Sequence, residues 1–140
     1  MAVNTRFATG VHTLVLLAAE PELKQTSEEI ARKLNTNPVV IRRVLSLLRQ
    51  AGLVGSHKGP TGGTKLAKPP KAIRLGDIYR ALEPSPVLHV SSISGDHAAK
   101  LSGLLEKTIR NAQAALESEL DGTTLAQFAK KSEKGDKKKK

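Results

Sequence analysis

The sequence predicts a mainly α-helical fold that contains one small β-hairpin, and three observations lead to that expectation. Apolar residues recur at helical spacing through the first half of the chain and again over residues 96–122. Between these stretches, two short runs of alternating apolar and polar residues, 53–57 and 64–68, flank the glycine-rich segment KGPTGG (58–63). Glycine supplies the positive φ angles that a hairpin turn requires, so we expect a hairpin within a helical chain.

The first two helices are predicted from periodicity and from their end signals. Residues 4–20 place apolar side chains on one face at helical spacing, and Pro21 ends that helix. Residues 26–35 begin with Thr26 and Glu29, which have the spacing of a capping box. In that arrangement each side chain accepts a hydrogen bond from the other residue's backbone N–H, which fixes where the helix begins.

A third helix is predicted over residues 38–52, after a short connection. Asn37 is a good N-cap, Pro38 suits the first helical position, and Gly52 ends the helix. Four polar residues face outward: Arg42, Arg43, Ser46 and Arg49. Two helices joined by a tight turn, the second with a basic outer face, are typical of a helix-turn-helix, and a hairpin directly after them is a wing.

The end of this first unit is predicted at a fourth helix, residues 74–83, which is closed by Pro84 and packs behind the wing. We therefore expect residues 1–83 to form a winged helix-turn-helix domain. Residues 84–95 are rich in serine and proline, as linkers are.

The C-terminal third is predicted to be a dimerisation unit over residues 96–130, made of one long helix and a short closing helix. The long helix carries a broad apolar stripe but has no domain of its own to bury it against, so pairing with a second copy is the economical solution. The expected dimerisation residues are Leu101, Leu104, Leu105, Ile109, Ala112 and Leu116. Residues 131–140 are too rich in lysine to fold alone, and we expect a disordered basic tail.

The charge distribution favours a polyanionic partner. The formal net charge is +10, and residues 1–90 hold 13 Lys and Arg against 6 Asp and Glu. Proteins that bind single strands stack bases on aromatic side chains, but this chain has only Phe7, Tyr79 and Phe128. Duplex DNA is therefore the favoured nucleic acid.

Other classes of protein receive no support from the sequence. The glycine-rich segment lacks the spacing of a nucleotide-binding loop, and no arrangement of nucleophile, base and acid typical of an enzyme is present. We expect no catalytic residues, no cofactor and no metal site. The sequence also shows no signal-peptide pattern and no apolar run of about 20 residues, so a cytoplasmic protein without membrane contact is expected.

The segment GLVGSHKGPTGGTKLAKPPKAIRLGDIYRALE (52–83) resembles the bacterial Rrf-two family of winged helix-turn-helix transcriptional regulators. The similarity lies in G-L-V, a basic residue before G-x-x-G-G, L-A-K-P-P, and an apolar-Asp-Ile helix that ends in glutamate. RFATGVHTLVLLA (6–18) and TLAQF (124–128) also fit, so the resemblance covers about residues 1–130.

The resemblance implies that the helix starting near Asn37 lies in the major groove and that the wing meets the minor groove or its phosphates. Arginine pairs well with guanine and valine can contact a thymine methyl, although Arg42 and Arg43 have the alternative of being solvated or touching phosphates. Thr26 and Ser27 either meet a phosphate or serve only as caps. The expected DNA-binding residues are Thr26, Ser27, Asn37, Val39, Val40, Arg42, Arg43, Lys58, Gly59, Pro60, Thr61 and Gly62.

Two departures from the family pattern limit what the resemblance implies. Thr64 replaces the aromatic residue that commonly follows the paired glycines, which is expected to loosen the packing of the wing. Members that hold an iron–sulfur cluster use cysteines between the fourth and the long helix, whereas this chain has no cysteine, so that cluster is not expected here. His89 and His97 bracket this segment, where a structural role is favoured over metal binding.

The predicted function is that of a sequence-specific transcriptional regulator which binds double-stranded DNA, as a homodimeric repressor on a palindromic operator. Any small-molecule effector is unknown from the sequence. The alternative is a winged-helix protein that acts through protein–protein or nonspecific nucleic-acid contacts.

Overall fold

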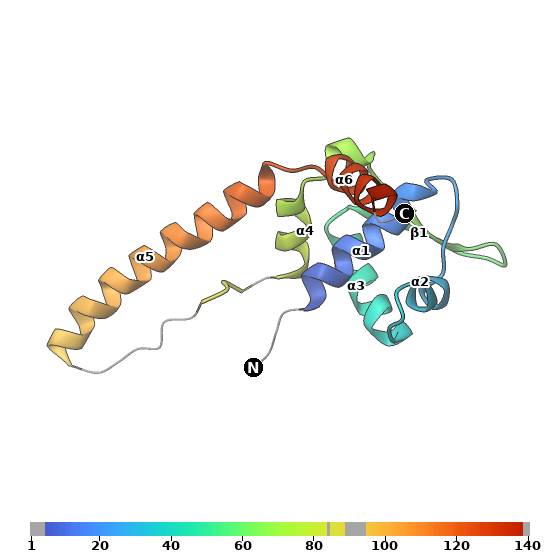
Figure 1. Cartoon of the computed structure of the whole chain (residues 1–140). Coiled ribbons are helices and arrows are strands. Elements are labelled where there is room, and N and C mark those ends of the chain that lie inside the picture. Colours follow the sequence, from blue (N-terminus) through green and yellow to red (C-terminus); the bar gives the residue numbers. More distant parts are fainter. Residues whose placement is uncertain (1–4, 84, 89–94, 139–140) are drawn as a thin grey trace.

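The computed structural model describes residues 5–83, 85–88 and 95–138, and within them it confirms a mainly helical fold with one antiparallel hairpin (Figure 1). The predicted linker therefore lies largely outside the described residues. The elements are α1 (Thr5–Ala19), α2 (Ser27–Lys33), α3 (Pro38–Gln50), β1 (Val54–His57), β2 (Gly63–Leu66), the short 3-10 helix η1 (Pro70–Ala72), α4 (Leu75–Leu82), α5 (Asp96–Asp121) and α6 (Leu125–Lys138).

One hydrophobic core joins α1–α4 and the hairpin, and we call this unit, residues 5–83, the head. Leu14 of α1, Leu48 of α3 and Ile78 of α4 are completely buried in it. The same core also takes in Leu125, the first residue of α6, which is completely buried although it follows α5 in the sequence. The head is therefore completed by a side chain from the C-terminal part of the chain.

Strand β2 of the hairpin is also bonded to the segment before α2, beside the tip end of the two strands. Strands β1 and β2 pair from Val54 with Leu66 to His57 with Gly63. Thr64 of β2 also exchanges two backbone hydrogen bonds with Gln25, at N···O distances of 2.8 and 3.1 Å. This bridge fixes the direction in which the hairpin leaves the head, and Thr64 is itself buried.

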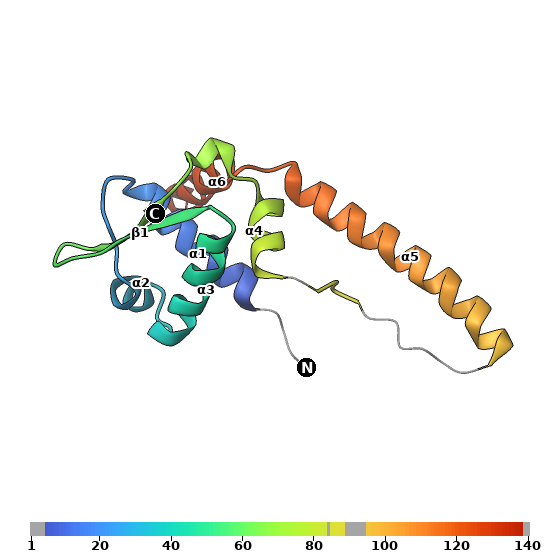
Figure 2. The same cartoon turned by 180° about the vertical axis from the view of Figure 1, so that it is seen from behind.

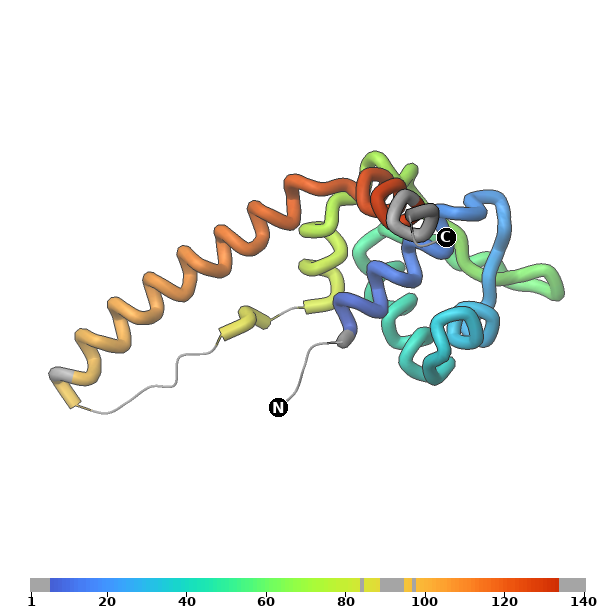
Figure 3. Tube along the Cα trace, viewed as in Figure 1, coloured from blue at the N-terminus to red at the C-terminus, as the bar shows by residue number. Residues whose placement is uncertain are grey.

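Helix α5 and the hairpin project from opposite sides of the head, as the two opposed views show (Figures 1 and 2). The chain leaves the head after α4, returns along α5, and packs α6 against α1 and η1 (Figure 3). The far end of α5 extends away from the head (Figures 1 and 2). Leu101, Leu104 and Leu105 are 56%, 66% and 52% exposed in the single chain.

The C-terminal helix is longer than the sequence predicts. We expected it to end near residue 130 and to be followed by a disordered tail over 131–140, but α6 continues to Lys138. Lysine and glutamate favour helix, and no proline interrupts residues 131–138, so a helix already started at Leu125 can continue through this region despite Gly135. The structure therefore differs from the expected tail over residues 131–138, which it describes as helix.

Candidate nucleic-acid interface

The turn between α2 and α3 is closed by backbone hydrogen bonds that set the angle between the helices. Asn35 adopts the left-handed conformation, with φ 52°. The backbone N–H of Thr36 then donates to the carbonyl of Ala31 at 2.9 Å, and that of Asn35 donates to Arg32 at 3.2 Å, which is the Schellman ending of a helix. Asn37 next accepts from the backbone N–H of Val39 at 2.8 Å, so α3 begins with its predicted cap.

Helix α3 has one face in the core and an opposite face open to solvent. Val39 and Val40, in its first turn, are 54% and 39% exposed. Arg42 and Arg43 are exposed on the same helix. The first turns of α3 therefore offer apolar and cationic groups together, the combination that suits base edges in the major groove.

Arg42 does not stand alone on this surface. Its Nη2 donates to Oε1 of Glu28 in α2 at 2.9 Å, and the two side chains are 55% and 59% exposed. The hydrogen bond from Arg42 is the main cause that lowers the pKa of Glu28 below its usual value. Glu28 was not among the residues expected at the interface, and 14 residues separate it from Arg42, so no local sequence pattern indicates the pair.

The start of α2 has the predicted capping box. Thr26 Oγ1 accepts from the backbone N–H of Glu29 at 3.2 Å, and Glu29 accepts from that of Thr26 at 3.1 Å. Thr26 and Ser27 are both half-buried. The structure thus confirms their place at the helix end, and a phosphate contact by either hydroxyl stays a prediction.

The tip of the wing is a tight turn of exposed residues. Lys58, Gly59, Pro60 and Thr61 are all exposed, and Gly59 has a φ of 112°, a conformation that favours glycine. Gly62 donates its backbone N–H to the Gly59 carbonyl at 2.9 Å, and a side chain on Gly62 would overlap the carbonyl of His57. The glycines therefore allow a tight turn at the tip, which can approach a DNA groove closely. Lys58 stands at the start of this turn.

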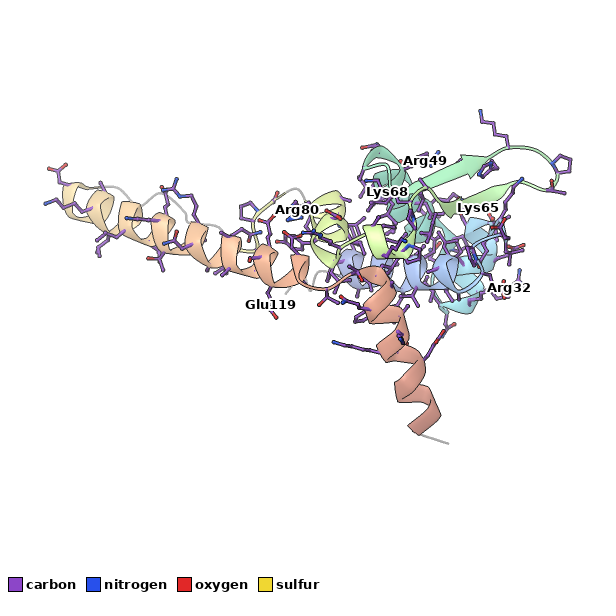
Figure 4. The ribbon with its side chains drawn as sticks, turned by 90° about the horizontal axis from the view of Figure 1, so that it is seen from above. Arg32, Arg49, Lys65, Lys68, Arg80 and Glu119 are labelled. Carbon is purple, nitrogen blue, oxygen red and sulfur yellow. The ribbon has the colours of Figure 1, made fainter. Side chains whose placement is uncertain are left out.

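Basic side chains continue from α3 along the hairpin. Figure 4 shows Arg49, at the end of α3, on the same side of the head as Lys65 and Lys68 of the hairpin segment. Glu119 lies on α5, away from all three. Arg49, Lys65 and Lys68 therefore add positive charge to the part of the head that carries α3 and the wing, and Lys65 also pairs with Glu22 at 3.6 Å.

The residues of this chain do not fit an iron–sulfur cluster held by cysteine thiolates, because the sequence has no cysteine. Over the described residues, no group of three or more His, Asp or Glu side chains is placed to hold a metal ion. His89 and the side chain of His97 lie outside the described part. Among the described helices, none is long and apolar enough to cross a membrane.

Comparison with known proteins places this geometry in one family. The family model described as "Rrf2: Iron-dependent Transcriptional regulator" matches residues 3–131. YwnA of Bacillus subtilis strain 168, whose name classes it as an HTH-type transcriptional regulator, is 35% identical over 127 residues, which cover 88% of this chain and 93% of YwnA.

Solved structures agree with this match. That of IscR from T. potens is 29% identical, with a TM-score of 0.73, and the match covers 96% of this chain and 90% of that one. The structure of CymR (YrzC), the global cysteine regulator of B. subtilis, is 30% identical, with a TM-score of 0.69 over 93% of this chain and 97% of that one. The chain therefore belongs to the Rrf2 (Rrf-two) family of DNA-binding transcriptional regulators and is not an enzyme.

Proposed function

We propose that the protein is a homodimeric repressor that binds a palindromic operator in double-stranded DNA, with α3 in the major groove and the wing at the minor groove. The observation that carries this proposal is the outer face of α3. Its first turns expose Val39, Val40 and Arg43 beside the paired Arg42, while the opposite face is held in the core. A helix that is packed into the core on one side and exposes apolar and cationic side chains on the other is suited to contact base edges.

Each expected contact has a distinct physical role in this proposal. Arg42 and Arg43 pair with the two acceptors of guanine, and the valines contact thymine methyl groups. Lys58 neutralises minor-groove phosphates as a point charge, without the planar fork of arginine. The hydroxyls of Thr26 and Ser27 bond to the phosphate backbone, where they set register rather than sequence preference.

Dimerisation through α5 is proposed because this helix exposes leucines that the single chain does not cover. Leu101, Leu104 and Leu105 are each more than half exposed, and Leu116 is 37% exposed. Exposed apolar stripes of this kind mark interaction surfaces, and a second copy offers the same stripe. A two-fold pair of heads then matches an operator whose half-sites lie about one helical turn apart.

Repression is proposed from the family resemblance, and the cytoplasm from the location of the DNA that such a regulator binds. The alternative function, nonspecific or protein-directed contact, keeps the same basic surface but removes any need for a fixed arrangement of α3 side chains. The two functions are distinguished by whether the protein prefers one duplex sequence over others. Nonspecific binding rests on phosphates alone and depends steeply on salt without preferring a site.

Selection of randomised duplexes on the purified full chain, at about physiological salt, tests the proposal. We expect a two-fold-symmetric sequence with half-sites about one helical turn apart. A reporter gene placed behind that sequence is then expected to fall in expression when the protein is present. Enrichment of no sequence, by protein that is dimeric and folded, would contradict the proposed operator binding and favour the alternative.

A further inference from the structure

A carboxylate stands on the surface that is proposed to meet DNA. Glu28 lies in the first turn of α2, and its Oε1 accepts a hydrogen bond from Nη2 of Arg42 in α3 at 2.9 Å. The pair therefore joins the two helices of the helix-turn-helix across their outer surface. Both side chains remain more than half exposed, so the pair is not buried support for the fold.

Two simple explanations do not account for the pair. An acidic residue in the first turn of a helix is favoured by the helix dipole, but Glu29 supplies a carboxylate there and also closes the capping box. An exposed ion pair adds little to stability. A negative charge that faces phosphates moreover weakens DNA binding, so evolution toward higher DNA affinity alone would remove Glu28.

We propose that Glu28 is a positioning residue that holds the guanidinium of Arg42 toward base edges and away from phosphates. This inference rests on the proposed function. Arginine has more N–H donors than the single bond to Glu28 uses, so the group keeps donors for the two acceptors of guanine. Without the carboxylate, the flexible Arg42 side chain is free to bond to any nearby phosphate, which strengthens binding to every duplex and weakens discrimination.

The test measures discrimination rather than affinity. The Kd of the full chain is determined for the duplex most enriched in the selection and for a scrambled duplex of equal length. The readout is the discrimination ratio, which is the Kd for the scrambled duplex divided by the Kd for the enriched duplex. We compare wild type with Glu28→Ala, Glu28→Gln and Arg42→Ala, and with the double variant Glu28→Ala/Arg42→Ala. Glu119→Ala is the matched control, because it removes the same charge from α5, away from the basic face of the head (Figure 4).

We expect Glu28→Ala to bind the scrambled duplex more tightly than wild type and to lower the discrimination ratio by about fivefold or more, since one specific arginine–guanine contact contributes at least about that factor. Glu28→Gln keeps an acceptor oxygen without the charge, so its discrimination ratio should lie between those of wild type and Glu28→Ala. The double variant should have the ratio of Arg42→Ala, because Glu28 acts only through Arg42. Glu119→Ala should keep the wild-type ratio.

The outcomes separate this inference from the proposed function. If wild type discriminates but Glu28→Ala tightens binding to both duplexes equally, Glu28 is only a local charge and the inference is overturned, while the proposed function stands. The same follows if Glu28→Ala lowers the ratio further in the Arg42→Ala background. If wild type itself binds both duplexes equally, operator recognition fails and the inference fails with it. Thermal unfolding of each variant checks that the fold is retained.

Discussion

Arg80 of α4 forms a two-pronged ion pair with Asp121, the last residue of α5, although 41 residues separate them in the sequence. Its Nε also lies 3.0 Å from Oε1 of Glu117, one turn earlier in α5. Gly76 of α4 lies directly against Asp121, where a side chain at position 76 would overlap the carboxylate. This cluster fixes the end of α5 on the head, and therefore the direction in which the helix projects.

Replacement of Arg80 should weaken this junction without unfolding the head. We expect Arg80→Ala to lower the free energy of unfolding by about 1 kcal/mol, because its ion pairs are partly exposed and contribute less than buried ones. For a chain of this size the melting temperature should fall by about 3 °C. Asp121→Asn should have a smaller effect, since the bond to Glu117 survives. An unchanged melting temperature for Arg80→Ala would show that the cluster is not structural support.

Leu125 should contribute far more to the stability of the fold than its position near the C-terminus indicates. It is completely buried in the core of the head, and its backbone N–H donates to the carbonyl of Ile73 at 2.7 Å. We expect Leu125→Ala to cost about 3 kcal/mol of unfolding free energy, measured by urea denaturation, because it leaves a cavity in that core. Phe128→Ala, on the same helix but 39% exposed, is the control and should cost clearly less.

The local features of this fold could be predicted from sequence because each depends on neighbouring residues. The capping box of Thr26 and Glu29 needs only three residues of separation, and Asn37 caps the helix that follows it directly. Gly52 ends α3 with a φ of 77°, as its position after the last apolar turn predicts. The hairpin similarly follows from alternation on both sides of glycines.

The features that sequence could not predict join distant segments. The bridge between Gln25 and Thr64 and the pair of Glu28 with Arg42 depend on how the head folds, which no periodicity encodes. Leu125 looks like one more apolar residue of a closing helix until the core of the head is seen around it. The expected DNA contacts of the α3 residues remain predictions, because exposure permits such contacts without proving them.

A charged residue in the apolar stripe of α5 should abolish the proposed dimer. We expect Leu105→Asp to give a monomer by light scattering, because pairing would bury an unpaired carboxylate. Leu105 is 52% exposed in the single chain, so the monomer itself should remain helical by circular dichroism. Lys107→Asp, which lies on the same helix but outside the stripe, should remain dimeric. A wild-type protein that is already monomeric would contradict the proposed assembly.

Removal of one side chain from the wing and from α3 should change DNA binding in different ways. Lys58→Ala should weaken binding to all duplexes alike and reduce the slope of log Kd against log salt by about 1, as expected for one lost phosphate contact. Arg42→Ala should instead change which duplex is preferred, since it removes a base contact. Equal losses for Arg42→Ala on selected and scrambled duplexes would contradict the assignment of Arg42 as a base reader.

The acidity of Glu28 reports whether its pair with Arg42 forms in solution. The hydrogen bond from Arg42 is the largest cause that lowers the pKa of Glu28 below its usual value of 4.5. A lowered pKa in the folded state means that the pair's contribution to stability is present above the unfolded pKa and is lost as the pH falls through the folded one. We therefore expect the Glu28 pKa, measured by NMR titration of its side-chain carboxyl carbon, to rise toward 4.5 in Arg42→Ala. The same titration of Arg43→Ala is the control, because Arg43 shows no bond to Glu28 within the described residues, and its Glu28 pKa should remain lowered. Identical Glu28 titrations in wild type and Arg42→Ala would show that the pair is not populated without DNA.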